Sequence, residues 1–193
     1  MRWEALFADM EAQVDAARIL DWEAEVAERA RAEAASVTLL DRLRGAVGDR
    51  LELRFGGAAG ASSAGSAALA GVLHLVGDDW LMLRVDQRSA VVPLNAVLSV
   101  EGLGRTAIRP SGAIRRSLAS ILRLLARDRS VVTFQLGGSV PERFTAVIDG
   151  VGSDHCDVAV LRDGELRREG HIVTRRTVPF SGIQTLLSPP REA

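Results

Sequence analysis

The chain has 193 residues, of which 47% are hydrophobic and 25% charged, with a formal net charge of −1. This composition excludes a disordered chain and is typical of one ordinary globular domain or two small ones. A single cysteine excludes an internal disulfide framework. The N-terminus does not resemble a secretory signal, and no apolar run approaches the ~20 residues of a spanning helix, so we expect a cytoplasmic protein.

The charge is distributed unevenly along the chain. Residues 1–104 carry 10 Arg and 16 acidic residues, whereas residues 105–193 carry 14 Arg and 9 acidic residues. An acidic front and a basic back can attract each other or bind different partners.

The first 35 residues predict a long helix. Residues 2–35 contain neither Gly nor Pro and are rich in Ala, Glu and Arg. Within them an apolar stripe recurs at three- and four-residue steps and includes Trp3, Phe7, Met10 and Val14. This stripe either packs on the rest of the chain or binds a partner's helix.

A shorter helix and five strands follow. Residues 36–48 predict the helix, with Ser36 as its N-cap. From Arg50 the period changes to two, and after a loop of small residues "GVLHLVG" and "DWLMLRVD" predict two strands around a Gly-Asp-Asp turn. "SAVVPLNAVLSVEGL" predicts two more strands, with Pro93 at an edge or a break.

The same pattern is then repeated. "SGAIRRSLASILRLLARDR" predicts a helix with Ser111 as a candidate N-cap, and "SVVTFQLGG" matches "RLELRFGG". "AVIDGVGSDHCDVAV", at residues 146–160, matches "GVLHLVGDDWLMLRV", at residues 71–85. "RRTVPFSGIQTLLS" matches "SAVVPLNAVLSV" after a polar insertion, "RDGELRREGH". The chain is therefore an internal duplication of a helix and five short strands.

This layout resembles the Sm-like family of Sm, LSm and Hfq proteins. Gly71 and Leu73 take the Gly-x-Leu places of that family's first motif. Gly77 and Leu81 stand where the family has its RNA-contacting Asp and Asn, and "VPLN" and "VPFS" replace the Arg-Gly of its second motif. The apolar scaffold therefore matches and the uridine-binding residues do not.

The resemblance implies an α+β fold with an N-terminal helix over 1–35 and Sm-like barrels over 36–103 and 111–188. Residues 104–110 are then a linker and residues 189–193 a tail. SH3-like and OB-type barrels share enough of the pattern to remain alternatives. Sm-like barrels associate through their fourth and fifth strands, which implies either a pseudo-dimer within one chain or a ring of six barrels from three chains.

The segment "SDHCDV" brings Asp154, His155, Cys156 and Asp157 together, but strand alternation separates them. Cys156 is predicted to face the core with Val158, while His155 and Asp157 face the other way. His171 has no second ligand at metal spacing, and no phosphate-binding loop is present. We therefore expect neither an enzyme nor a bound metal or cofactor.

The arginines of the second helix are the candidate nucleic-acid site. Four of them, Arg115, Arg116, Arg123 and Arg127, are expected to bind phosphates, with the last three on one helix face. The same residues could instead pair with the acidic first helix. The sequence thus predicts a non-enzymatic regulator that binds nucleic acid, with RNA favoured over DNA. The alternative is an adaptor that binds proteins, or copies of itself, through the first helix and the barrel edges. We expect no membrane or small-molecule partner.

Overall fold

The computed structural model describes residues 2–56, 68–108, 116–138, 140–162 and 172–190. Ser111, Arg115 and His171 lie outside the described residues, as does most of the small-residue loop. The chain divides into two compact units, residues 1–39 and 40–193.

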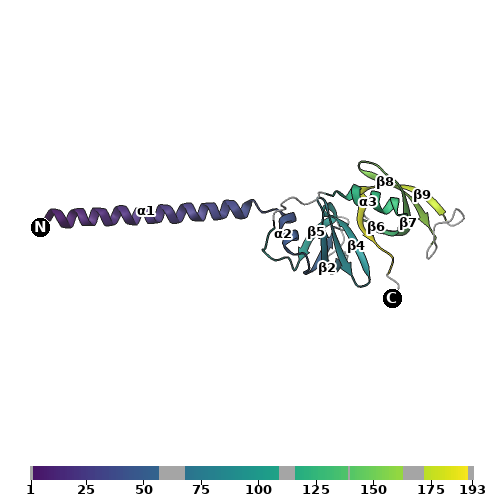
Figure 1. Ribbon diagram of the computed structural model, residues 1–193, viewed down its shortest axis with the longest axis horizontal. Coiled ribbons are helices and arrows are strands. Elements are labelled where there is room, and N and C mark those ends of the chain that lie inside the picture. Colours follow the sequence, from purple (N-terminus) through teal and green to yellow (C-terminus); the bar gives the residue numbers. More distant parts are fainter. Residues whose placement is uncertain (1, 57–67, 109–115, 139, 163–171, 191–193) are drawn as a thin grey trace. The chain divides into compact units, whose positions relative to one another are not determined.

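Helix α1 spans Arg2–Ala35 and accounts for nearly all of the first unit (Figure 1). It runs over the segment without Gly or Pro, where no residue interrupts the helical hydrogen bonds. The N–H of Ser36 donates to the carbonyls of Ala32 and Glu33, both at 3.1 Å, and its Oγ donates to the carbonyl of Glu33 at 2.7 Å. Ser36 therefore follows the last residue of α1 and closes its final turn. The prediction that Ser36 is the N-cap of the following helix is wrong, because α2 begins at Leu39 and Thr38 precedes it.

The second unit contains two repeats of one helix and five strands. The first repeat consists of α2 (Leu39–Gly45), β1 (Arg50–Phe55), β2 (Ala68–Val76), β3 (Trp80–Val85), β4 (Arg88–Pro93), η1 (Leu94–Ala96) and β5 (Val97–Glu101). The second consists of α3 (Leu118–Arg127), β6 (Val131–Leu136), β7 (Glu142–Val151), β8 (His155–Leu161), β9 (Ile172–Pro179), η3 (Phe180–Gly182) and β10 (Ile183–Leu187).

The two repeats pair their strands in the same register. Trp80 lies opposite Pro93 in the first repeat, and His155 lies opposite Pro179 in the second. Both fourth strands end at a proline that precedes a short 3-10 helix, because Pro cannot continue the hydrogen-bonded ladder. Residues of the two repeats can therefore be compared position by position.

The predicted fold class, a long N-terminal helix followed by two Sm-like barrels, is wrong. The strands described in the second unit form one ten-stranded antiparallel sheet, in the order β5-β1-β2-β3-β4-β10-β6-β7-β8-β9, which does not close. The repeats are joined because β4 pairs directly with β10. An isolated fourth strand would leave a row of backbone N–H and C=O groups unpaired, and the last strand of the second repeat supplies partners for them. In Figure 1 the strands of the first repeat lie beside those of the second, and α3 packs against β7.

Each repeat supplies most of one apolar core. The first core gathers around Leu43 of α2 and Leu53 of β1, both fully buried. The second gathers around Leu122 of α3 and Phe134 of β6, whose ring stacks on Phe144 with 5.4 Å between centroids. Burial of side chains of this size contributes roughly 1.5–3 kcal/mol each.

The turn between β2 and β3 holds the start of α3. The indole N–H of Trp80 donates to the carbonyl of Arg116 at 2.8 Å, and a carboxylate oxygen of Asp79 accepts from the N–H of Leu118 at 2.7 Å. Ser117 occupies the N-cap position without a side-chain capping bond, so Asp79 of the other repeat takes over that function. This contact positions the arginine-bearing helix on the sheet.

Candidate functional site

The two ends of the sheet are the first candidate surface. We call the β4–β10 contact the inner junction, and β5 and β9, which end the strand order, the outer edges. Because the registers of the repeats match, β9 is the equivalent of β4, and β5 is the equivalent of β10. The two outer edges are thus the equivalents of β4 and β10, the two strands that pair with each other at the inner junction.

The inner junction is short and largely apolar. Leu186 lies opposite Val91, and Leu187 lies opposite Ala90. Two hydrogen bonds of 2.9 Å extend the pairing, from the N–H of Ser188 to the carbonyl of Ser89 and from the N–H of Ser89 to the Oγ of Ser188. Beside the junction is a cavity of about 350 Å³ with an almost wholly apolar lining. Its lining includes Met82, Val91, Ile121, Leu125 and Leu186.

The outer edges are exposed where the inner junction is buried. Ala90 and Val91 of β4 are buried, whereas their equivalents on β9, Arg176 and Thr177, are exposed. Leu98 of β5 is 72% exposed, although its equivalent on β10, Gln184, is 7% exposed. β5 pairs only with β1 and β9 only with β8 among the described strands, so the outer backbone edge of each has no strand partner there.

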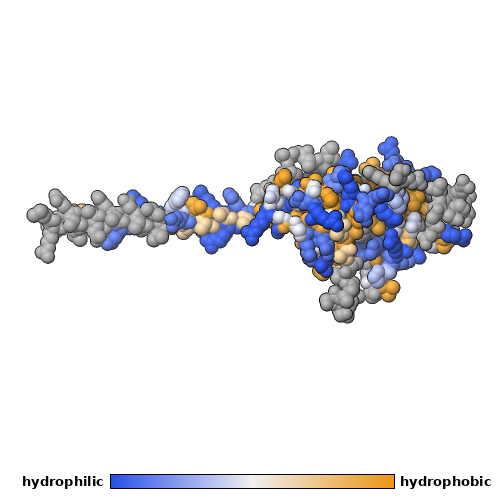
Figure 2. Space-filling view, turned by 90° about the horizontal axis from the view of Figure 1, so that it is seen from below, coloured by the Kyte–Doolittle hydropathy of each residue, from blue (hydrophilic) through white to orange (hydrophobic). Residues whose placement is uncertain are grey.

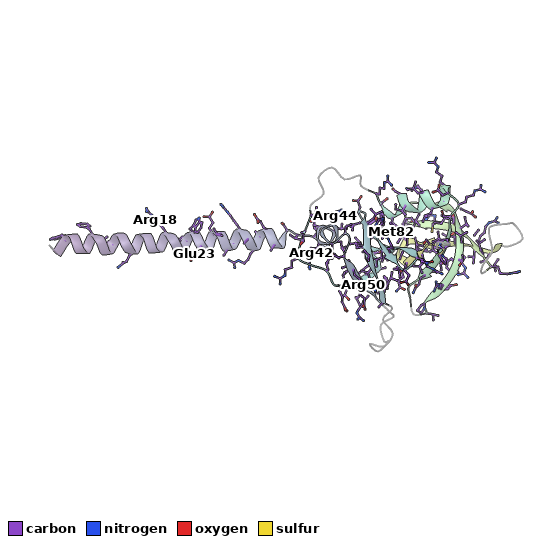
Figure 3. All side chains as sticks on the ribbon, turned by 60° about the horizontal axis from the view of Figure 1, so that its bottom comes forward. Arg18, Glu23, Arg42, Arg44, Arg50 and Met82 are labelled. Atoms are coloured by element: carbon purple, nitrogen blue, oxygen red, sulfur yellow. The ribbon has the colours of Figure 1, made fainter. Side chains whose placement is uncertain are left out.

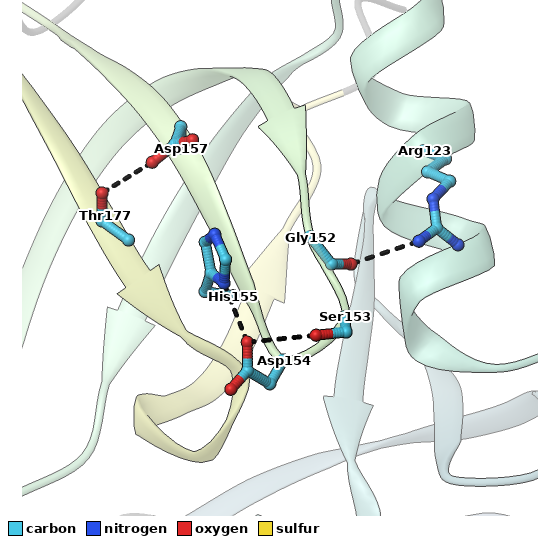
Figure 4. A network of polar contacts seen from close by, with 7 residues as sticks. All are labelled: Arg123, Gly152, Ser153, Asp154, His155, Asp157 and Thr177. Carbon is cyan, nitrogen blue, oxygen red and sulfur yellow. Dashed lines mark hydrogen bonds and ion pairs between the residues drawn. The ribbon is translucent and has the colours of Figure 1, made fainter.

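The predicted arginine site is only partly assembled. Arg116, Arg123 and Arg127 are exposed, and no ion pair joins any of them to an acid among the described residues. Arg123 and Arg127 lie one turn apart on α3, but Arg116 precedes the helix, which starts at Leu118. The prediction that all three share one helix face is therefore wrong. The guanidinium of Arg123 donates to the carbonyl of Gly152 at 3.1 Å, which holds this side chain beside the turn that follows β7 (Figure 4).

The predicted partner-binding stripe lies on α1. Trp3, Phe7 and Met10 are 72%, 57% and 53% exposed, and the side chain of Val14 lies outside the described ones. Figure 2 shows hydrophobic residues interspersed with hydrophilic ones on the coloured, C-terminal part of α1.

The segment at residues 153–157 is not a catalytic centre. Cys156 is fully buried, as predicted, and burial together with the nearby Asp157 carboxylate raises the pKa of its thiol to about 12. His155 faces away from it, with Nδ1 2.8 Å from a carboxylate oxygen of Asp154, and Asp157 accepts a 2.6 Å hydrogen bond from Thr177 (Figure 4). The hydrogen bond that Asp154 accepts from Nδ1 of His155 raises the pKa of His155, and the same contact lowers that of Asp154. No group of three or more metal-ligating side chains is found in the part of the chain that the structure describes.

Sequence reasoning missed the charged residues at the outer edges. Arg176 on β9 and Glu101 on β5 look like ordinary solvated residues when each repeat is read alone. When the two repeats are aligned, Arg176 corresponds to Ala90 and Glu101 corresponds to Leu187. Ala90 and Leu187 lie opposite each other at the inner junction. An apolar pair inside thus corresponds to a charged pair outside.

No protein-family model, curated protein or solved structure matches this chain. Among the described residues, the structure contains no helix that is both long enough and apolar enough to span a membrane.

Proposed function

We propose that this chain is a non-enzymatic binding protein whose copies assemble head to tail, with β9 of one copy pairing with β5 of the next. The observation that supports this most strongly is the inner junction, in which the equivalents of these two strands pair within one chain. A cytoplasmic location belongs to the same proposal and agrees with the single, buried Cys156.

The proposal favours an assembly of several chains over a closed pseudo-dimer. Among the strands that the structure describes, one of the two possible junctions forms within the chain, and β5 and β9 remain at opposite ends of the strand order. Exposed edges of this kind pair readily with other strands, and head-to-tail contacts generate rings or open filaments.

The test is the solution mass of the full chain and of a variant whose β9 edge is blocked. The N–H of Ser89 points from β4 toward β10, and because strand residues alternate, the N–H of Val91 points the same way. Thr177 is the equivalent of Val91, so its N–H points outward from the free edge of β9. Thr177→Pro removes this outward N–H, and Thr177→Ala retains it as the matched control. We expect light scattering to give a multiple of the single-chain mass for wild type and T177A, and the single-chain mass for T177P. A wild-type protein that stays a single chain at all concentrations would refute the proposal.

A second candidate function is phosphate binding by Arg116, Arg123 and Arg127. The observation that favours it is that these side chains are exposed and form no ion pair with an acid among the described residues. The partial resemblance to Sm-like proteins favours RNA over DNA, and the missing uridine-contacting residues imply binding without sequence preference.

This candidate is tested by the affinity of the full chain for random single-stranded RNA at several salt concentrations. Three phosphate contacts on a single strand give a slope of about −2 in log K against log salt. We expect R116E/R123E/R127E to abolish binding, and R18E/R29E/R31E, which makes the same charge change on α1, to retain more of it. Equal losses in both variants would assign binding to net charge alone.

A further inference from the structure

The outer edges differ from the inner junction in chemistry as well as in exposure. On the β4 side of the inner junction, the cross-strand pair Met82 and Val91 is apolar. The equivalent pair on the β9 side is Asp157 and Thr177, which hydrogen-bond to each other. Next along the strand, Arg176 replaces Ala90.

The matched registers predict which residues would meet across an outer junction. Since Leu187 lies opposite Ala90 inside the chain, their equivalents Glu101 and Arg176 lie opposite each other when β5 of one copy pairs with β9 of another. Residues directly opposite in an antiparallel pair have Cβ atoms about 4.5–5.5 Å apart, so the two charges come within reach.

A second pair follows from the helices. Leu43 of α2 and Leu122 of α3 are each fully buried, and aligning them makes Arg42 the equivalent of Ile121. Ile121 and Met82 line the same cavity at the inner junction. At an outer junction their places are taken by Arg42 and Asp157, again a cation and an anion (Figure 3 labels Arg42). The guanidinium of Arg42 also donates to the carbonyls of Leu103 and Gly104 in its own copy.

Both cross-strand residues already belong to ion pairs within their own copy. A guanidinium nitrogen of Arg54 lies 2.6 Å from a carboxylate oxygen of Glu101, while Arg176 pairs with Glu142 and lies over the ring of Phe144. These pairs hold Glu101 and Arg176 at their respective edges. Because Arg54 also pairs with Glu52 at 3.2 Å, pairing of the edges would join five charges of alternating sign into one network, which is worth more than isolated surface pairs.

We propose that the outer junction is an electrostatic one, in which Arg176 and Asp157 of one copy pair with Glu101 and Arg42 of the next. This rests on the head-to-tail assembly proposed above and adds what controls it. The inner junction is apolar and permanent, whereas the outer junction dissociates as salt rises. Polar outer edges also limit pairing with unrelated apolar strands, because a charge opposite an apolar residue is left without a partner.

The experiment measures assembly of the full chain by sedimentation between about 0.1 M and about 1 M salt, over which the Debye length falls from about 10 Å to about 3 Å. We expect wild-type assemblies to dissociate over this range. At low salt, R176E or E101R should raise the dissociation constant by at least about tenfold, because like charges then face each other. The double variant R176E/E101R should assemble more tightly than either single variant, although each reversed residue then lies beside a like charge of its own copy, Glu142 or Arg54.

The matched control is Arg175→Glu, which makes the same charge change on the adjacent, exposed residue of β9, whose side chain points to the opposite face of the strand. Circular dichroism of every variant checks that the fold is intact. If wild type assembles but R176E and E101R behave like R175E, or if salt has no effect, the charge pairing is overturned and the head-to-tail assembly stands. If wild type is a single chain throughout, both proposals fail.

Discussion

Replacement of Gly77 by alanine tests how the β2–β3 turn holds α3, and the internal repeat provides the control. An alanine Cβ at position 77 would lie 2.6 Å from Cδ1 of Trp80, and one at Gly152 would lie 2.5 Å from Cε1 of His155. Neither glycine has its backbone in the left-handed region, so the cost of each substitution comes from the ring and not from the backbone. The two rings differ in their freedom, because Trp80 is 4% exposed and the His155 side chain is 42% exposed.

The magnitude follows from what each ring loses when it moves. The indole of Trp80 has no space to retreat, which costs about 2 kcal/mol by overpacking, and its 2.8 Å bond to the carbonyl of Arg116 contributes about 1 kcal/mol more. The reduced entropy of the unfolded chain offsets about 0.7 kcal/mol. Gly77→Ala is therefore expected to destabilise the protein by about 2 kcal/mol, whereas Gly152→Ala changes stability by less than about 0.5 kcal/mol because His155 swings into solvent.

Thermal unfolding followed by circular dichroism of the β-sheet signal measures the difference. At about 2–4 °C per kcal/mol for a unit of this size, G77A should lower Tm by about 4–8 °C, and G152A should lie within about 2 °C of wild type. A G77A variant as stable as wild type would refute the view that Trp80 is locked in place. Equal losses in both variants would show that the backbone of the turn, and not the ring, sets the cost.

Three further predictions concern single features. Since burial raises the pKa of Cys156 to about 12, native protein at pH 8 should react with iodoacetamide about a thousandfold more slowly than an ordinary thiol, and rapid labelling before unfolding would contradict this. The hydrogen bond with Asp154 raises the pKa of His155 in the folded protein. The stability that this bond contributes is therefore present below the pKa of His155 in the unfolded chain and is lost as pH rises through its pKa in the folded protein. An NMR titration of the D154N variant should give a lower midpoint for His155 than wild type. Deletion of residues 1–35 should leave the head-to-tail assembly intact, because β5 and β9 lie in the second unit, and loss of assembly by light scattering would assign it to α1.

Local sequence patterns predicted the strands and their faces well. Alternation placed Cys156 inside and His155 outside, and the structure has them so. The same alternation fits His74 and its equivalent Asp149, which are both exposed. These inferences depend only on the two-residue period of a strand, which is a property of the local backbone.

Helix starts were less predictable. Ser36 and Ser111 were reasonable N-caps by residue type, yet Ser36 ends α1, and α3 begins at Leu118. The start of α3 is held by Trp80 and Asp79, two residues of the other repeat. A contact between segments nearly 40 residues apart leaves no mark in the local pattern around the helix.

The sequence by itself determined the duplication, the identity of the strands and the residues that face each core, because these depend on periodicity and turn chemistry close along the chain. Only the tertiary structure decided that β4 pairs with β10 and that one sheet replaces two barrels. Strand edges pair through backbone N–H and C=O groups that every residue except proline carries in full, so the choice of partner is set by which edges the packed cores bring together.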